Sequence, residues 1–75
     1  MSGDLQDISS ILKQLRTELK LSQESLAHEI GVSFASVNRW EKGKSSPSKL
    51  ARKQIQSYCD RLFQEGKIQR AVIWS

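Results

Sequence analysis

Asn38 and Arg39 are adjacent residues, and each side chain can make two hydrogen bonds to a single planar polar group. Arginine donates both bonds to guanine O6 and N7, and asparagine can pair in the same way with adenine N6 and N7. Phe34 and Ala35 precede them and are suited to contact a thymine methyl group. These residue types, so close together, indicate the chemistry that reads base edges.

A helix from Phe34 to Lys42 would sort its side chains into two faces. Val37 and Trp40 are spaced i, i+3 and would point inward, toward a core. The opposite face would then present Ala35, Asn38, Arg39 and Lys42, with Phe34 and Ser36 on the flanks.

The segment from Ser22 to Trp40 predicts two short helices around a tight turn. Ser22 is a good N-cap for a helix over Gln23 to Ile30, and Gly31 can end that helix in the left-handed conformation. Ser33 caps the second helix. Because only Gly31 and Val32 lie between the first helix and the cap of the second, the helices cannot pack antiparallel and must cross steeply. Such a helix-turn-helix unit can place its second helix in a DNA major groove.

Two more helices are expected on either side of this unit. An apolar stripe predicts the first over Asp7 to Leu19. The second is predicted over Pro47 to Glu65, with Ser46 as its N-cap, Pro47 at its first position and room for a break near Ser57. Its apolar residues repeat at helical spacing, and they are Leu50, Ala51, Ile55, Tyr58, Cys59, Leu62 and Phe63. Of these, Tyr58, Cys59 and Phe63 are expected in the core.

Positive charge is concentrated in the second half of the chain. The formal net charge is +4, yet residues 1–32 carry three Lys and Arg against five Asp and Glu, whereas residues 33–75 carry nine against three. From Arg39 to Lys53 the ratio is six to one. A nucleic-acid backbone is the natural partner of such a field. A merely solvated basic surface is the alternative interpretation.

The run LKLSQESLAHEIGVSFASVNRWEKGKSSPSKL resembles the helix-turn-helix domains of the lambdoid phage repressor and Cro family, also called the Xre family. The resemblance extends from Ile8 to about Leu62 and implies an all-α, compact bundle of four to five helices. Ser25 departs from it, where the family often has a Glu that completes the capping box. The residues that carry it are Gln23, Ala27, Gly31, Val37, Trp40, Glu41, Gly43 and Pro47.

The resemblance also implies roles for individual residues. It suggests that Arg16 pairs with Glu41 and ties the first helix to the third; two independent exposed charges are the alternative. Phe34 could instead pack against the second helix or a partner protein. In the docked geometry of the family, the residues facing the bases would be Ser33, Phe34, Ala35, Asn38 and Arg39. The residues expected at phosphates are Gln23, Lys42, Lys44, Ser45 and Ser46.

The predicted organisation is a frayed end over residues 1–6, one domain over 7–65 with the helix-turn-helix at about 22–41, and an apolar tail over 66–75. The tail could fold onto the core as a helix or strand, form a dimer contact, or begin a further domain. Specific binding by so small a domain usually needs a dimer. The best candidates for a homodimer contact are Leu62, Phe63 and the tail residues Val72, Ile73 and Trp74.

The function predicted from these features is sequence-specific binding of double-stranded DNA through the major groove, by a repressor-like transcriptional regulator. The alternatives are a protein-interaction module, such as an antitoxin or a coactivator, and the DNA-targeting head of a larger protein. One His, one Cys and no phosphate-binding Gly loop argue against an enzyme, a metal site or a cofactor. A lone Cys59 and the absence of any long apolar run predict a cytoplasmic protein without a membrane span.

Overall fold

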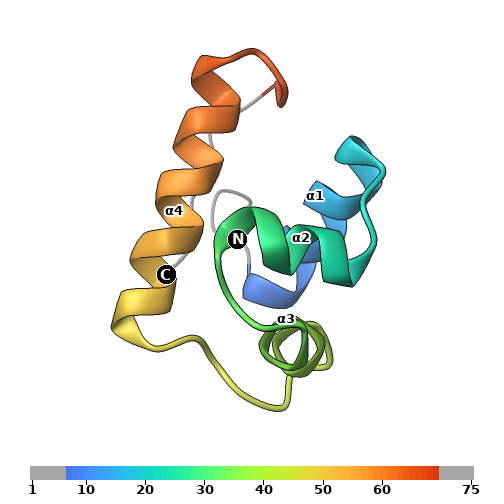
Figure 1. The fold of residues 1–75 in the computed structure, drawn as a ribbon, viewed down its shortest axis with the longest axis vertical. Coiled ribbons are helices and arrows are strands. Elements are labelled where there is room, and N and C mark those ends of the chain that lie inside the picture. Colours follow the sequence, from blue (N-terminus) through green and yellow to red (C-terminus); the bar gives the residue numbers. More distant parts are fainter. Residues whose placement is uncertain (1–6, 70–75) are drawn as a thin grey trace, which may run out of the picture.

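The computed structural model describes residues 7–69 of the 75-residue chain. Within that part, four helices follow one another: α1 (Ile8–Leu19), α2 (Gln23–Ile30), α3 (Phe34–Glu41) and α4 (Lys49–Gln64) (Figure 1). The all-α class is therefore confirmed. None of these four helices combines the length and the apolar character that crossing a membrane requires.

Each helix begins at a polar N-cap whose side chain accepts the backbone N–H three residues later. The four caps are Asp7, Ser22, Ser33 and Ser48, with donor–acceptor distances of 2.8, 3.0, 3.1 and 3.2 Å. An N-cap satisfies one of the backbone donors that a helix start leaves unpaired. The starts of α1, α2 and α3 thus lie where the local sequence predicted them.

The start of α4 corrects the prediction. Ser46 is not the cap and Pro47 is not the first helical residue, because the helix begins after Ser48, at Lys49. Pro47 is instead a buried residue of the loop, so its ring packs inside the protein before the helix starts. The expected break near Ser57 is also absent, since α4 is continuous to Gln64.

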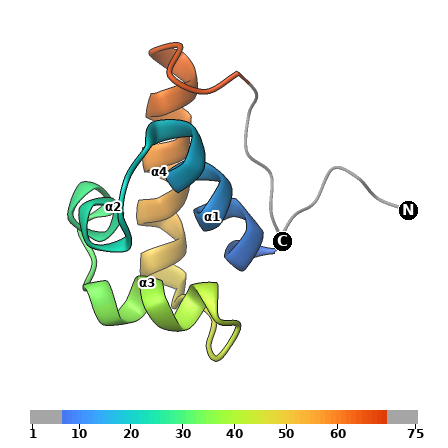
Figure 2. The same cartoon turned by 90° about the vertical axis from the view of Figure 1, so that its right-hand side faces the viewer.

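The core lies between the helices and gathers one face from each of them. It contains Ile11, Leu12, Leu15, Leu26, Ala27, Ile30, Val37, Trp40, Ala51, Ile55, Tyr58, Cys59, Leu62 and Ile68. α3 packs on α1 and α2, and α4 packs on α2 (Figure 2). Because α4 is covered on one side, its buried residues share one face, and they are Ala51, Ile55, Tyr58, Cys59 and Leu62.

Two apolar residues of α4 lie off its packed face, and the prediction of a core position for one of them, Phe63, is wrong. Leu50 is 69% exposed and Phe63 is 45% exposed. Each is a sequence neighbour of a buried residue, Ala51 or Leu62, and a step of one residue turns a helical side chain by about 100°. Both side chains are therefore carried off the packed face.

The turn between α2 and α3 sets the steep crossing that the short connection required. Gly31 has φ +94° and donates its N–H to the Ala27 carbonyl at 2.9 Å. When α3 is viewed end-on, α2 runs across the picture (Figure 1), and a quarter turn reverses their roles (Figure 2). Ala27 is buried in this region, where its small side chain allows the close approach of the helices.

After α4 the chain bends back at Gly66, φ +76°, and places Ile68 in the core. This supports the folded-back tail as far as Gln69, in bends rather than in a helix or strand. The tail residues 72–74 that were predicted as a dimer contact lie outside the described residues. Leu62, also predicted as a homodimer contact, is 4% exposed in the core and offers little surface to a partner.

Candidate nucleic-acid interface

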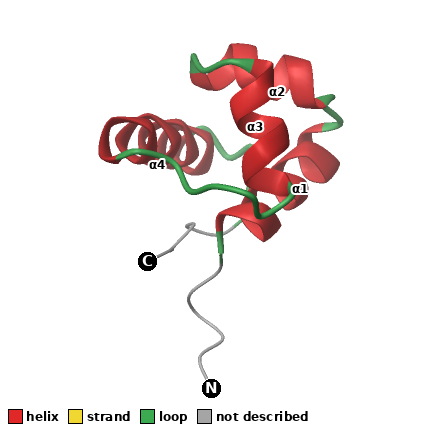
Figure 3. Ribbon diagram, turned by 90° about the horizontal axis from the view of Figure 1, so that it is seen from below, coloured by secondary structure: helices red, strands yellow, loops and turns green. Residues whose placement is uncertain are grey.

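α3 lies at the periphery of the bundle, in front of α1 and α2 when the molecule is seen from below (Figure 3). Its underside is fixed by Val37 and Trp40, which are both buried against the other helices. Its N-terminus is held by the Ser33 cap. The helix is thus a rigid rod with one face anchored and the other free.

The structure exposes the residues that were predicted to face the bases. Phe34 is 51% exposed, and Asn38 is half-buried. The others are exposed, and they are Ser33, Ala35 and Arg39. All five are therefore at least partly accessible, at or within α3.

The loop after α3 continues this accessible surface. Its first residues are tied back to the helix, because Gly43 donates its N–H to the Trp40 carbonyl at 3.1 Å and Lys44 donates to Arg39 at 3.0 Å. Gly43 has φ +73°, a conformation that costs glycine little. Four of the predicted phosphate-binding residues are exposed in this loop or at its start: Lys42, Lys44, Ser45 and Ser46.

A bidentate ion pair joins the C-terminal end of α3 to α1. Arg16 Nε lies 2.8 Å from Glu41 Oε2, and Arg16 Nη2 lies 2.9 Å from Glu41 Oε1. The Glu41 side chain is only 3% exposed, and that of Arg16 is 28% exposed. Two parallel bonds from a guanidinium to a carboxylate are stronger and more directional than a single bond between the same charges.

The ion pair changes the pKa of both partners. Burial by itself would raise the pKa of Glu41, but the hydrogen bonds from Arg16 and Gln23 outweigh it and leave that pKa below its ordinary value. The hydrogen bond to Glu41 in turn raises the pKa of Arg16. Glu41 is therefore a buried carboxylate that stays ionised at neutral pH.

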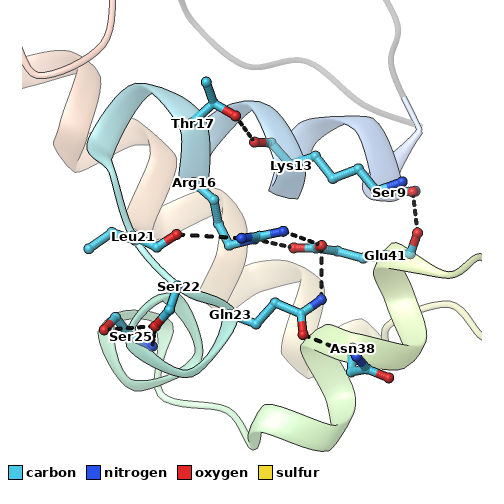
Figure 4. Close-up of polar contacts among 10 residues, drawn as sticks. All are labelled: Ser9, Lys13, Arg16, Thr17, Leu21, Ser22, Gln23, Ser25, Asn38 and Glu41. Atoms are coloured by element: carbon cyan, nitrogen blue, oxygen red, sulfur yellow. Dashed lines mark hydrogen bonds and ion pairs between the residues drawn. The ribbon is translucent and has the colours of Figure 1, made fainter.

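Gln23 extends this ion pair to the outer face of α3. Its Nε2 donates to Glu41 Oε1 at 3.0 Å, and its Oε1 accepts from Asn38 Nδ2 at 3.0 Å (Figure 4). We call the four residues Arg16, Glu41, Gln23 and Asn38 the polar chain. Gln23, expected at a phosphate, and Asn38, expected at a base, are thus bonded to each other.

No signal in the sequence pointed to this bond. Gln23 and Asn38 lie 15 residues apart, on two helices that meet only because of the turn at Gly31. Another hydrogen bond between α1 and α3 was not predicted either: Ser9 Oγ donates to the Glu41 carbonyl at 2.6 Å. These two hydrogen bonds join α3 to α2 and to α1.

Other reactive groups do not assemble a site in the described part of the chain. Burial raises the pKa of the Cys59 thiol to about 11, so the reactive thiolate is scarce at neutral pH. Among residues 7–69 no cluster of three or more His, Cys, Asp or Glu side chains is placed to hold a metal ion. The exposed face of α3 and the following loop are the strongest candidate for function.

A helix-turn-helix family matches residues 12–58, well over half of the chain. This span contains α1 from Leu12, all of α2 and α3, and most of α4. The chain belongs to the helix-turn-helix family of the Xre and Cro type. The predicted family is therefore confirmed, and the four helices are the DNA-binding domain of that family.

One curated relative of the chain is the HTH-type transcriptional activator BcrR of Enterococcus faecalis, 40% identical over 47 residues. The match covers 63% of this chain but only 23% of the activator, so the chain spans less than a quarter of that relative's length. No solved structure gives a significant match to the chain.

Proposed function

We propose that this domain binds specific sequences of double-stranded DNA by inserting α3 into the major groove, and that it thereby regulates transcription. The observation that carries the proposal is the orientation of α3: its apolar residues Val37 and Trp40 are buried, while Asn38 and Arg39 face outward. A helix fixed in this way can present the same side chains to every site that it meets.

Bases would be read by the outer face of α3. Arg39 is exposed and can donate two hydrogen bonds to a guanine, and Asn38 can pair with an adenine. Phe34 and Ala35 would contact thymine methyl groups at the start of the helix, with Ser33 beside them. These contacts would supply sequence preference rather than most of the affinity.

Phosphates would be held on either side of that face. Lys42, Lys44, Ser45 and Ser46 would hold one strand from the loop, and the N-terminus of α2 would hold the other through its free N–H groups. Gln23 would have fewer hydrogen-bonding groups available for a phosphate than a side chain without partners. Its Oε1 and one N–H are used within the polar chain, which leaves its second side-chain N–H for a phosphate.

Selection of binding sites from random duplex DNA, at two salt concentrations, tests the proposal. We expect one recovered motif whose affinity falls as salt rises. Weak binding without sequence preference would refute it and favour the protein-interaction alternative, such as an antitoxin or a coactivator. The exposed Phe34 is the observation that supports this second candidate.

A pair of variants separates base reading from phosphate binding. Arg39→Ala should weaken binding to the selected site by about 1–3 kcal/mol and relax the preference at one base pair. Lys44→Ala is the matched change, since it also removes one exposed cation. It should weaken binding to all sequences and reduce the salt slope by about one unit. Equal losses of base preference in both variants would contradict the division of roles.

The size of the domain also bears on its assembly. Binding to two half-sites about 34 Å apart would need a dimer or a larger protein that carries two such domains. Phe63, 45% exposed on α4, is the remaining described candidate for a homodimer contact. The similarity to a small part of a longer activator supports a DNA-targeting head as the other arrangement. That relative is an activator, so the proposed regulation of transcription does not extend to the predicted repression.

A further inference from the structure

The polar chain fixes which end of each amide faces which neighbour. An ionised carboxylate can only accept hydrogen bonds. Glu41 Oε1 accepts from Arg16 Nη2 at 2.9 Å and from Gln23 Nε2 at 3.0 Å, and Glu41 Oε2 accepts from Arg16 Nε at 2.8 Å. Gln23 must therefore turn its NH₂ group toward Glu41, because its carbonyl oxygen there would face another acceptor.

The orientation of Gln23 determines that of Asn38. With its NH₂ group at Glu41, Gln23 offers only its Oε1 to α3, and an oxygen requires a donor. Asn38 donates this hydrogen bond from Nδ2, at 3.0 Å, so its Oδ1 points away from Gln23 (Figure 4). The free edge of Asn38 then carries an acceptor, Oδ1, and the second N–H of Nδ2.

This free edge suits one purine better than the other. Adenine presents a donor at N6 and an acceptor at N7, which match the Asn38 acceptor and donor. Guanine presents acceptors at both O6 and N7, and O6 would face Asn38 Oδ1. An unrestrained asparagine could instead turn its NH₂ group toward guanine and donate both N–H groups, to O6 and N7. In this protein that rotation would set Oδ1 against Gln23 Oε1.

We propose that the buried carboxylate of Glu41 fixes the amide of Asn38 through Gln23, so that the domain selects adenine over guanine at the base that Asn38 contacts. The inference rests on the proposed binding of α3 in the major groove. Glu41 and Gln23 are positioning residues in this scheme, because they set the preference through Asn38. The buried Glu41 would thus restrict which base the exposed side of Asn38 can bind.

The test begins with the motif selected by the wild-type domain. Asn38→Ala identifies the contacted base pair, as the position where the preference is lost. Dissociation constants are then measured for duplexes with adenine or guanine at that position. We expect adenine to be favoured between about fivefold and 100-fold. Replacing that adenine by 2-aminopurine, which lacks the N6 amine, should cause a comparable loss.

Glu41→Gln removes the restriction while keeping the size of the side chain. Because a glutamine can donate as well as accept, Gln23 and then Asn38 can reverse. We expect the ratio of adenine to guanine affinity to fall to within about twofold, from the loss of a discriminating pair. The preferences at the other positions of the motif should remain.

Arg16→Lys is the matched control, because it weakens the same ion pair but leaves Glu41 an ionised carboxylate. It should retain the wild-type ratio even if it lowers the melting temperature. Gln23→Ala removes the link between Glu41 and Asn38 in the polar chain, at a half-buried residue. This variant tests the inference if Glu41→Gln does not fold. Circular dichroism confirms that each variant is helical at the temperature of the binding assay.

The outcomes separate this inference from the proposed function. If the wild type selects no motif, the proposed function fails, and this inference fails with it. If a motif is found but folded Glu41→Gln or Gln23→Ala keeps the wild-type ratio, the inference alone is refuted. It is equally refuted if Arg16→Lys loses the ratio as fully as Glu41→Gln, or if guanine is preferred at the Asn38 position.

Discussion

Replacing Arg16 by Met would leave the Glu41 carboxylate buried without its counter-ion. The change keeps a long side chain on α1 and removes the bonds of 2.8 and 2.9 Å to Glu41. Glu41 would retain only the hydrogen bond from Gln23 at 3.0 Å. Since its side chain is 3% exposed, water cannot replace the lost donors without an opening of the structure.

The expected cost follows from the unequal burial of the two partners. Breaking a fully buried ion pair by removing one partner costs about 3–5 kcal/mol. Because 28% of the Arg16 side chain is exposed, part of the pair is screened by water, and we expect Arg16→Met to cost about 2–4 kcal/mol. Glu41→Gln leaves the charge on the more exposed partner and should cost less, about 1–2 kcal/mol.

A double-mutant cycle measures the coupling between these two residues. The four proteins are the wild type, Arg16→Met, Glu41→Gln and the double variant, and their free energies of unfolding come from urea denaturation. The double variant has no uncompensated charge, so it should cost less than the two single changes together by about 1–2 kcal/mol. For a domain of this size, Arg16→Met should lower the melting temperature by roughly 10–25 °C.

Lys44→Met is the control for removing a cation, because Lys44 is exposed in the loop after α3. It should change the free energy of unfolding by less than about 0.5 kcal/mol. If Arg16→Met is no more destabilising than Lys44→Met, or if the two single changes simply add, the tie between α1 and α3 contributes nothing and the reasoning is wrong.

Three further outcomes are expected. The pKa of Glu41 lies below its ordinary 4.5, so its stabilising contribution is complete above that pH and is lost as the pH falls through the folded value. The stability difference between wild type and Glu41→Gln, followed by urea denaturation at several pH values, should therefore shrink in acid. Ser48→Ala should lower the free energy of unfolding by about 1 kcal/mol, whereas Ser46→Ala should change it by less than about 0.5 kcal/mol, because only Ser48 caps α4. Equal effects of these two changes would contradict the assigned cap. A disulfide reagent should label Cys59 in the native protein only as fast as the domain opens, because burial raises the pKa of its thiol to about 11; labelling as fast as in urea would contradict its burial.

Local signals predicted α1, α2 and α3 to within about one residue. A cap bonds to a backbone N–H three residues away, and Gly31 accepts a positive φ for reasons that belong to glycine itself. Such effects act over a single turn of chain, so the sequence displays them directly. The steep crossing also followed from chain length, because so short a connection leaves no other arrangement.

Prediction failed where a residue's environment depends on distant parts of the chain. Two serines could have capped α4, and the burial of Pro47 in the tertiary fold accompanies the choice of Ser48 over Ser46. Leu50 and Phe63 are apolar and helical, but the packing of the described helices leaves them 69% and 45% exposed. Lys20 was also missed: it ends α1 with φ 58°, an uncommon conformation for a residue with a Cβ atom.

The sequence by itself determined the family and, apart from the start of α4, the helices, and it predicted the side chains that are proposed to meet a base. Only the tertiary structure decided how Asn38 presents its amide, because the two ends of an amide have nearly the same shape and differ only in hydrogen bonding. That choice depends on Gln23, which lies 15 residues away, and on a buried Glu41 that can accept bonds but not donate them.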